Sequence, residues 1–286
     1  MEPVNEAWRL NLPQFLTLPD FSLDDADTDR HGNVYVCDSL NACVYKFSPD
    51  SIPMGVYELD HPKGDTGNTF PMSIAVDEDS NFFVSDSRNG RVLKYDSLGR
   101  PISEYLTPGV VAICYAGQGA IYTLSTAAGL ERIERYDRRG NLQDVLPCPP
   151  RSRGQSDPCL LRLDTDAYGN IYMSQGMPPY QISRIRADGS RTDTLRRDIE
   201  FPNDAVLIAD IAVDRATGNL FALLSCKTAG LQLVDCFHPD GQFAGVLGLP
   251  HHESLYSVLS ISPDSSVYAL NTGNGPGAGD LLRASR

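Results

Sequence analysis

The chain of 286 residues has few of the features that mark membrane-spanning or exported proteins. No apolar run approaches the roughly 20 residues that a helix needs to cross a bilayer. Residues 1–5 also do not resemble the start of an export signal, in which basic residues are followed by an apolar run. We therefore expect no transmembrane segment and a cytoplasmic protein. A leader removed ahead of the printed start would leave the same sequence and would mean that the protein is exported.

Positive charge is scarce as well. The chain has 24 Lys and Arg residues against 37 Asp and Glu residues, for a net charge of −13, and only four of the basic residues are lysines. Such a field repels phosphate groups, so we expect no nucleic-acid partner. Residues 131–200 hold 12 Arg and 11 acidic residues, net +1, which leaves −14 for the rest of the chain. This region either docks an acidic protein or is a solvated face of mixed charge.

The short motifs of metal and nucleophile chemistry are also missing. No Cys-x-x-Cys, His-Glu-x-x-His or Gly-x-Ser-x-Gly segment occurs, which argues against a zinc knuckle, a helical zinc-protease site and a hydrolase nucleophile turn. The seven cysteines allow three short-range pairs, with Cys114 left over: Cys37 with Cys43, Cys148 with Cys159, and Cys226 with Cys236. Free thiols are the preferred interpretation, because a cysteine on a strand is also an ordinary small apolar residue.

What the chain does contain is one pattern repeated six times: an aspartate, a tight turn and an apolar-aromatic pair. The copies occupy residues 29–35, 77–83, 119–122, 166–172, 214–221 and 262–268, of which the third lacks the aspartate and the sixth lacks the glycine. The aromatic residues that end the copies lie 39 to 50 residues apart. Repetition at this period predicts an array of similar structural units.

Each unit also contains further turns and short strands. A second turn with Asp follows in five units, as at residues 95–99 and 136–140. Asp bonds its own backbone there, and Gly accepts a positive φ. Four strands in each of six units predict an all-β fold, a six-bladed β-propeller formed as one domain by residues 1–286. We expect the blades at about residues 21–59, 70–106, 109–146, 158–195, 205–247 and 255–286.

The last unit stops before its outermost strand. Residues 6–12, which include the single tryptophan, Trp8, resemble the outer strands of other units. We therefore expect this N-terminal segment to complete the sixth blade and to close the ring. A disordered tail is the alternative, although a Trp beside alternating Leu residues is costly to leave in water.

The segment from Asp77 to Gly99 resembles the NHL repeat, whose usual form joins an Asp turn, an apolar-aromatic strand, a polar loop and a second Asp-x-x-Gly turn. The resemblance extends over nearly the whole chain. It implies a six-bladed propeller, a ring that serves binding proteins, lyases and lactonases alike.

In such a ring, the loops between the second and third strands of each blade, and the loops that lead into the inner strands, gather at one mouth of the central channel. We name this the loop face, and it is the default ligand site. Among its residues, Arg88 and Tyr180 are candidate ligand-binding side chains.

Aligning the inner strands on the turn aspartate places polar residues near the axis, and the candidates for ligand binding there are Asp25, Asp27, Arg162, Asp164 and Asp210. The converging carboxylates could hold a hard cation such as Ca²⁺. The preferred interpretation is that they line a water-filled channel with Arg162 as counter-ion.

Two metal sites remain as alternatives. Asn203 and Asp204 resemble the pair with which gluconolactonase-type propellers bind a divalent ion, so Asp25, Asp210, Asn203 and Asp204 are the candidate metal ligands. Propeller lyases hold zinc with histidines from separate blades, and His61 with His251 or His252 could meet on the loop face. His31 and His238 lie in Asp turns of the opposite face.

Together these observations favour a binding protein or scaffold without catalytic activity or a cofactor. It would present its loop face to a protein or a small ligand, as a monomer unless held in a complex. The alternative is a divalent-metal-dependent lactonase or lyase, with Ca²⁺ or Zn²⁺ at the channel mouth.

Overall fold

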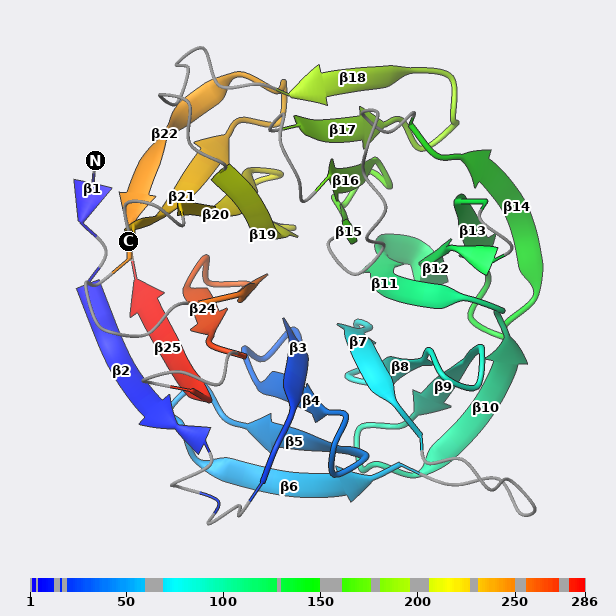
Figure 1. Cartoon of the computed structure of the whole chain (residues 1–286), viewed down its shortest axis with the longest axis horizontal. Helices are drawn as coiled ribbons and strands as arrows, with labels where there is room; N and C mark the ends of the chain where they lie inside the picture. Colours follow the sequence, from blue (N-terminus) through cyan, green and yellow to red (C-terminus); the bar gives the residue numbers. More distant parts are fainter. Residues whose placement is uncertain are drawn as a thin grey trace.

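Short β-branched and aromatic segments form the strands of the protein, and polar turns separate them. The computed structural model describes residues 2–3, 5–12, 16, 20–59, 69–127, 130–149, 161–175, 181–195, 206–226, 231–249, 256–272 and 278–285. Six blades, each built from four antiparallel strands, surround a central channel as in a propeller (Figure 1). The prediction of an all-β, six-bladed propeller is confirmed.

Each blade runs from an inner strand beside the channel to an outer strand at the rim. The first three blades are β3 (Leu23–Thr28), β4 (Val34–Asp38), β5 (Cys43–Phe47) and β6 (Pro53–Glu58); β7 (Pro71–Val76), β8 (Phe82–Asp86), β9 (Arg91–Tyr95) and β10 (Pro101–Leu106); and β11 (Val110–Ala116), β12 (Ala120–Ser125), β13 (Arg132–Tyr136) and β14 (Leu142–Pro147). A short 3₁₀ helix, η1 (Gly117–Gly119), joins β11 to β12.

The other three blades follow the same order. They are β15 (Leu161–Thr165), β16 (Ile171–Gln175), β17 (Gln181–Ile185) and β18 (Thr192–Leu195); β19 (Val206–Val213), β20 (Leu220–Cys226), β21 (Leu231–Phe237) and β22 (Phe243–Gly248); and β23 (Val258–Ile261), β24 (Val267–Leu270), β25 (Asp280–Ser285) and β2 (Asn5–Asn11).

In the blades that have it, the repeated aspartate holds the turn that leaves the inner strand. The Asp29 carboxylate accepts hydrogen bonds from the backbone N–H groups of His31 and Asn33, at 2.9 and 3.0 Å. It also accepts a bond from the Asn33 side chain at 2.8 Å. Asp77 and Asp166 make the same set of bonds. The pattern Asp-x-x-x-Asn is therefore a local folding unit, which explains its recurrence.

The apolar core lies in layers between neighbouring blades. One layer joins Tyr35 and Val44 of the first blade to Phe82 and Tyr95 of the second. Tyr57, on the outer strand β6, stacks on Phe82 with ring centroids 5.5 Å apart. A blade thus buries its apolar faces only when a neighbour is present on each side.

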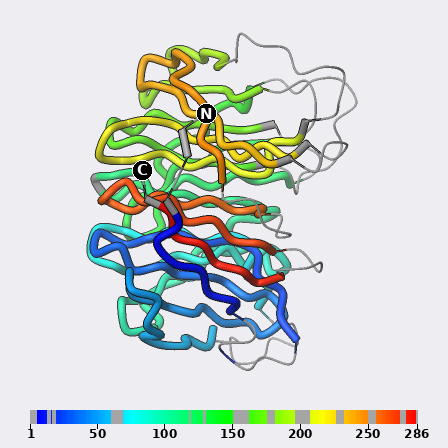
Figure 2. The backbone as a smooth tube through the Cα atoms, turned by 90° about the vertical axis from the view of Figure 1, so that its left-hand side faces the viewer, coloured from blue at the N-terminus to red at the C-terminus, as the bar shows by residue number. Residues whose placement is uncertain are grey.

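The N-terminal segment closes the ring, as the sequence predicts. Strand β2 pairs antiparallel with β25 from Asn5 with Ser285 to Asn11 with Asp280. Trp8 packs edge-on against Tyr268 at 5.9 Å, and its indole N–H donates to the Pro49 carbonyl of the first blade at 2.7 Å. The side view shows the N-terminal chain beside the red C-terminal strand (Figure 2).

A second closing contact is absent from the sequence prediction. The two-residue strand β1 (Glu2–Pro3) pairs in parallel with the outer strand β22 of the fifth blade. The N-terminal segment therefore bridges the last two blades, because β2 belongs to the sixth.

Cys37, Cys43, Cys114 and Cys148 are free thiols, so the pair of Cys37 with Cys43 is not formed. The side chain of Cys226 lies outside the described part of the chain. Cys159 lies outside the described residues. Among the residues that the structure describes, no helix has the length and apolar character to span a bilayer.

Candidate functional site in the central channel

The inner strands are edge strands, with one side open to the channel. Backbone N–H groups on that side need hydrogen-bond partners, because an unpaired buried donor is costly. Asp25 of β3 supplies two of these partners. One carboxylate oxygen accepts the N–H of Ala26 at 2.9 Å, and the other accepts the N–H of Ile74 on the next blade at 3.0 Å. The carboxylate therefore fastens two neighbouring inner strands together.

The same bridge recurs around the channel. Asp27, Asp164 and Asp210 each accept the N–H of the residue that follows them in the chain. Their second oxygens accept the N–H groups of Val76, Val213 and Leu259 on the next blade, at 2.8, 2.7 and 2.7 Å. In every case the partner lies 49 residues further on, one repeat along the chain. The axial aspartates of the sequence analysis are thus structural links between blades.

Hydroxyl groups on the inner strands also form hydrogen bonds to neighbouring blades. The Ser73 hydroxyl accepts the N–H of Ile113 at 3.2 Å. Thr165 donates to the Tyr115 carbonyl at 2.9 Å, and Thr28 donates to the Ile261 carbonyl at 3.0 Å. Ser73, at the level of Asp25 in the repeat, therefore bonds to the next blade with a hydroxyl group. Thr28 and Thr165 instead bond to the preceding blade through its carbonyl oxygens.

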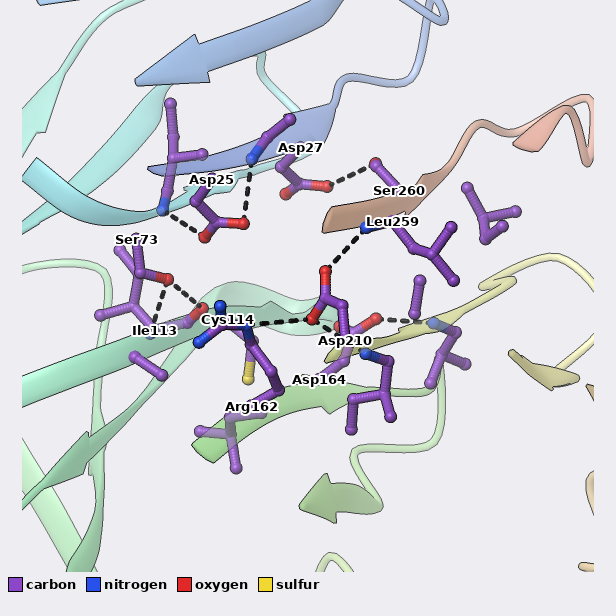
Figure 3. A pocket seen from close by; sticks show the side chains of 18 of the residues that line it. Asp25, Asp27, Ser73, Ile113, Cys114, Arg162, Asp164, Asp210, Leu259 and Ser260 are labelled. Carbon is purple, nitrogen blue, oxygen red and sulfur yellow. Dashed lines mark hydrogen bonds and ion pairs between the residues drawn. The ribbon is translucent and has the colours of Figure 1, made fainter. Parts of the chain in front are cut away.

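Two arginines neutralise part of the negative charge. Arg162 Nε lies 3.4 Å from Asp210 Oδ1, with Asp25 across the channel (Figure 3). Burial raises the pKa of Asp210 to about 8, against the lowering effect of Arg162. Burial also raises the pKa of Asp25. Burial therefore favours the neutral form of these carboxyl groups.

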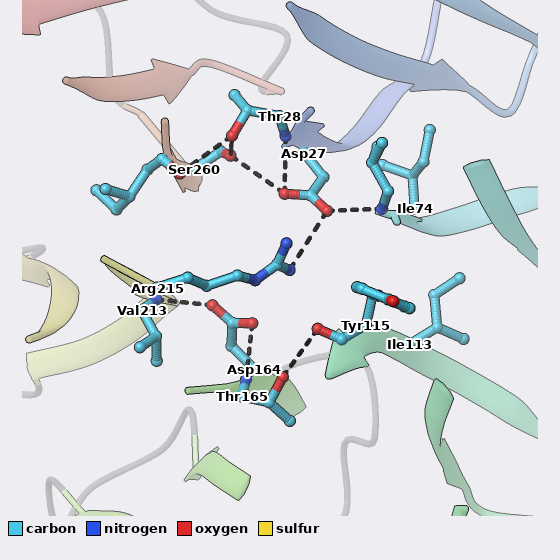
Figure 4. A network of polar contacts seen from close by, with 12 residues as sticks. Asp27, Thr28, Ile74, Ile113, Tyr115, Asp164, Thr165, Val213, Arg215 and Ser260 are labelled. Carbon is cyan, nitrogen blue, oxygen red and sulfur yellow. Dashed lines mark hydrogen bonds and ion pairs between the residues drawn. The ribbon is translucent and has the colours of Figure 1, made fainter. Parts of the chain in front are cut away.

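Arg215 occupies the next level of the channel and was not among the sequence candidates. Its guanidinium extends across the channel between Asp27 and Asp164 (Figure 4), with Nη2 at 3.8 Å from Asp27 Oδ2. Burial raises the pKa of Asp164 to about 6, and Arg215 opposes this rise. The one sequence signal was its place directly after the turn aspartate Asp214, where Arg30 follows Asp29 in the first blade.

The space between these side chains is small. A cavity of about 50 Å³ lies among Asp25, Asp27, Arg162, Asp164 and Asp210. That volume has room for a few water molecules and not for a metabolite. The structure therefore brings together all five axial residues that the sequence analysis selected.

Arg88, a candidate on the loop face, is not part of this group. Arg88 is exposed beside β8, with its guanidinium 4.8 Å from the centre of the Phe70 ring. Tyr180, Asn203, Asp204, His61, His251 and His252 lie outside the described residues. His31 and His238 are exposed in turns.

No metal-ligating cluster stands out where the structure is described. In that part of the chain, no three side chains of His, Cys, Asp or Glu are grouped as a metal ion would need. The four-residue metal set of the sequence analysis, Asp25 and Asp210 with Asn203 and Asp204, therefore stays a prediction.

Comparisons with known proteins identify the fold. No protein-family model and no curated protein matches the sequence. Among solved structures, a member of the DUF4221 family from Bacteroides vulgatus superposes with a TM-score of 0.65 at 9% identity, with 99% of this chain and 97% of that one covered. Virginiamycin B lyase from Staphylococcus aureus gives 0.62 at 12% identity, over 94% and 82% of the two chains. A gluconolactonase from Xanthomonas campestris gives 0.61 at 15%, over 99% and 95%. At such identities the likeness shows the propeller fold alone, and the finer resemblance to the NHL repeat stays a prediction.

Proposed function

We propose that the protein is a binding propeller without catalytic activity of its own, which presents the loop face around the channel mouth to a protein or a small ligand. The observation that carries this proposal is the use of the axial carboxylates. Both oxygens of Asp25, Asp27, Asp164 and Asp210 accept backbone N–H groups.

Such carboxylates are poorly suited to catalysis. A carboxylate whose two oxygens each accept a backbone N–H has fewer lone pairs left for a proton or a cation, and it cannot turn toward a substrate without releasing these partners. Here that release would leave a backbone N–H of a neighbouring blade unpaired, at a cost of about 1–3 kcal/mol for each donor. The axial residues are therefore better explained as links that hold the binding scaffold rigid.

The alternative is a divalent-metal-dependent lactonase or lyase with its site at the channel mouth. One observation favours it. Burial raises the pKa of Asp210 to about 8, so this carboxyl group can exchange a proton near neutral pH. The similar folds of a lyase and a gluconolactonase agree with this alternative at the level of fold only.

Elemental analysis of the purified protein separates the two functions. A binding propeller is expected to contain divalent metal only in trace amounts, before and after the substitution Asp210→Asn. Stoichiometric metal that is lost in Asp210→Asn and retained in the turn variant Asp96→Asn would overturn the proposal in favour of the metalloenzyme.

A second experiment tests binding at the loop face. Cross-linking and affinity capture from a lysate are expected to recover a partner, or mass spectrometry a retained small molecule. This capture should be weakened by Arg88→Glu on the loop face and unaffected by Arg100→Glu in an outer turn. Equal capture by both variants would place binding elsewhere.

A further inference from the structure

The channel has a second mouth, opposite the loop face, where the inner strands end. We name this the turn face, and its opening, the funnel, has walls from all six blades. Its lining includes one residue from each blade in turn, namely Arg30, Val76, Tyr115, Ala167, Arg215 and Ile261. Its volume of about 470 Å³ is within the range of small-molecule sites, roughly 300–1,000 Å³. It is about nine times the inner cavity of 50 Å³.

Arg215 separates the two spaces, because it lines both of them. Its side chain is 35% exposed, and its guanidinium lies 5.9 Å from the centre of the Tyr115 ring. The funnel therefore has a cationic floor, and Val76 and Ile261 are among its apolar walls. Its lining also contains the acidic residues Asp29, Asp77 and Glu78. These are already partnered, because Asp29 and Asp77 accept N–H groups of their own turns and Glu78 pairs with Arg138.

The hydrogen-bond donors of this floor are unused within the described chain. A guanidinium has five N–H donors, yet Arg215 makes no hydrogen bond to any described residue. Its nearest carboxylate oxygen, on Asp27, is 3.8 Å away, which is beyond hydrogen-bond length. The Asp27 and Asp164 oxygens are instead directed to backbone N–H groups.

We propose that the funnel binds a small monocarboxylate with an apolar or aromatic body. The carboxylate accepts two parallel hydrogen bonds from the Arg215 guanidinium, and the body lies against Tyr115, Val76 and Ile261. The planar fork of arginine matches a carboxylate in this way. A ligand cation would meet the guanidinium first, and a doubly charged phosphate would be repelled more strongly by Asp27 and Asp164.

The neighbouring carboxylates make this binding depend on pH. The charged or titratable groups that face Asp164 are Arg215, Asp27 on β3 and the Cys114 thiol on β11. With both aspartates ionised, Arg215, Asp27 and Asp164 together carry a net charge of −1. Because burial raises the pKa of Asp164 to about 6, protonation below that pH removes the excess negative charge. Carboxylate binding should therefore tighten as the pH falls from 8 to 6.

Benzoate is a suitable probe, with benzamide as its neutral analogue, benzylamine as its cationic analogue and inorganic phosphate as a second anion. At pH 6 we expect calorimetry to give one benzoate site with a dissociation constant of about 1 mM or lower. Benzamide and benzylamine should bind about tenfold more weakly or worse, because neither forms a charge-assisted pair. Phosphate should also bind more weakly than benzoate.

Two pairs of variants locate the site. Arg215→Gln should abolish benzoate binding, whereas Arg100→Gln, in an outer turn, should leave it unchanged. Ala167→Trp fills the funnel without altering the floor and should also abolish binding. Ala187→Trp, in an exposed outer turn of the same blade, is its control. Ala167→Trp decides the question if Arg215→Gln does not fold.

Several results would overturn the proposal. These are the absence of benzoate binding up to about 10 mM, equal binding in Ala167→Trp, preference for benzylamine, or tighter binding at pH 8 than at pH 6. The site is independent of the loop face, so its failure leaves the proposed function untouched, and the reverse is also true.

Discussion

Glycines in the outer turns have a role that is specific to their position in the ring. The outer-strand residue Tyr105 packs over the turn glycine of the next blade, Gly140, and Leu195 packs over Gly241 in the same way. Gly140 has φ of +81°, and a Cβ atom there would come within 2.6 Å of the Tyr105 ring. The positive φ and the close approach of Tyr105 therefore both require glycine at position 140.

The effect of the Tyr105 contact on stability can be measured by comparing Gly140 with Gly169. Gly140→Ala should lower the free energy of unfolding by about 2–4 kcal/mol, from the clash and the positive φ together. Gly169 has φ of +82°, but the nearest atom to a Cβ there lies 3.4 Å away. Gly169→Ala should therefore cost only about 1–2 kcal/mol. Urea unfolding of both variants checks the prediction, and equal losses would show that Tyr105 moves aside.

The inner strands depend on side chains to accept the backbone N–H groups along their open edges. In Asp164→Ala, the N–H groups of Val213 and Thr165 lose their partners. We expect a loss of about 2–4 kcal/mol in the free energy of unfolding. Asp96→Ala, in an exposed outer turn, should have a much smaller effect, because water can replace the carboxylate. Urea unfolding at pH 7 gives the comparison, and similar losses would argue against the role of the bridge between blades.

Strand β2 is the element that closes the ring. Its Trp8 and Leu10 pack against a cluster that contains Leu12, Tyr268 and Leu281. Removal of residues 1–12 exposes this cluster and the edge of β25. We expect the unfolding temperature to fall by more than about 10 °C, or the protein to aggregate.

Removal of residues 1–4 is the matched control. It deletes only β1, which pairs over two residues with β22. The unfolding temperature should change by less than about 3 °C. Thermal unfolding followed by circular dichroism measures both truncations, and two similar results would mean that β2 is not the principal closing element.

The whole molecule should be more stable in mild acid than in mild alkali. Burial raises the pKa of Asp210 to about 8 and those of Asp24 and Asp164 to about 6. A carboxyl whose pKa is higher in the folded chain binds more protons when folded. Its contribution is complete below the unfolded value of 3.8 and is lost as the pH rises through the folded value.

We therefore expect the free energy of unfolding to increase by about 1–3 kcal/mol between pH 8 and pH 5. Below pH 4 the trend reverses, because hydrogen bonds to Ser262 and Ser266 outweigh burial and hold the pKa of Asp264 at about 2. Urea unfolding at a series of pH values measures the profile. Asp210→Asn should flatten its slope between pH 8 and 5, and a slope unchanged in that variant would contradict the assignment.

The sequence alone determined the number of blades, the closing strand and the level of the axial residues. Each of these follows from local chemistry that repeats along the chain: an Asp29-type turn, a short apolar strand, and a spacing near 49 residues that carries Asp25 to Ile74 and Asp210 to Leu259. A repeat array translates sequence distance into position, so periodic residues can be placed without coordinates.

Only the tertiary structure decided what those residues do. Asp25 and Asp210 look like metal ligands in the sequence, but each faces the free edge of a neighbouring strand and accepts its N–H group. Arg215 follows a turn aspartate just as Arg30 does, yet its long side chain crosses the channel between Asp27 and Asp164. Partners for a carboxylate, and the path of a flexible side chain, depend on chain segments from other blades. Ring closure brings those segments together, and no local pattern encodes which groups then meet.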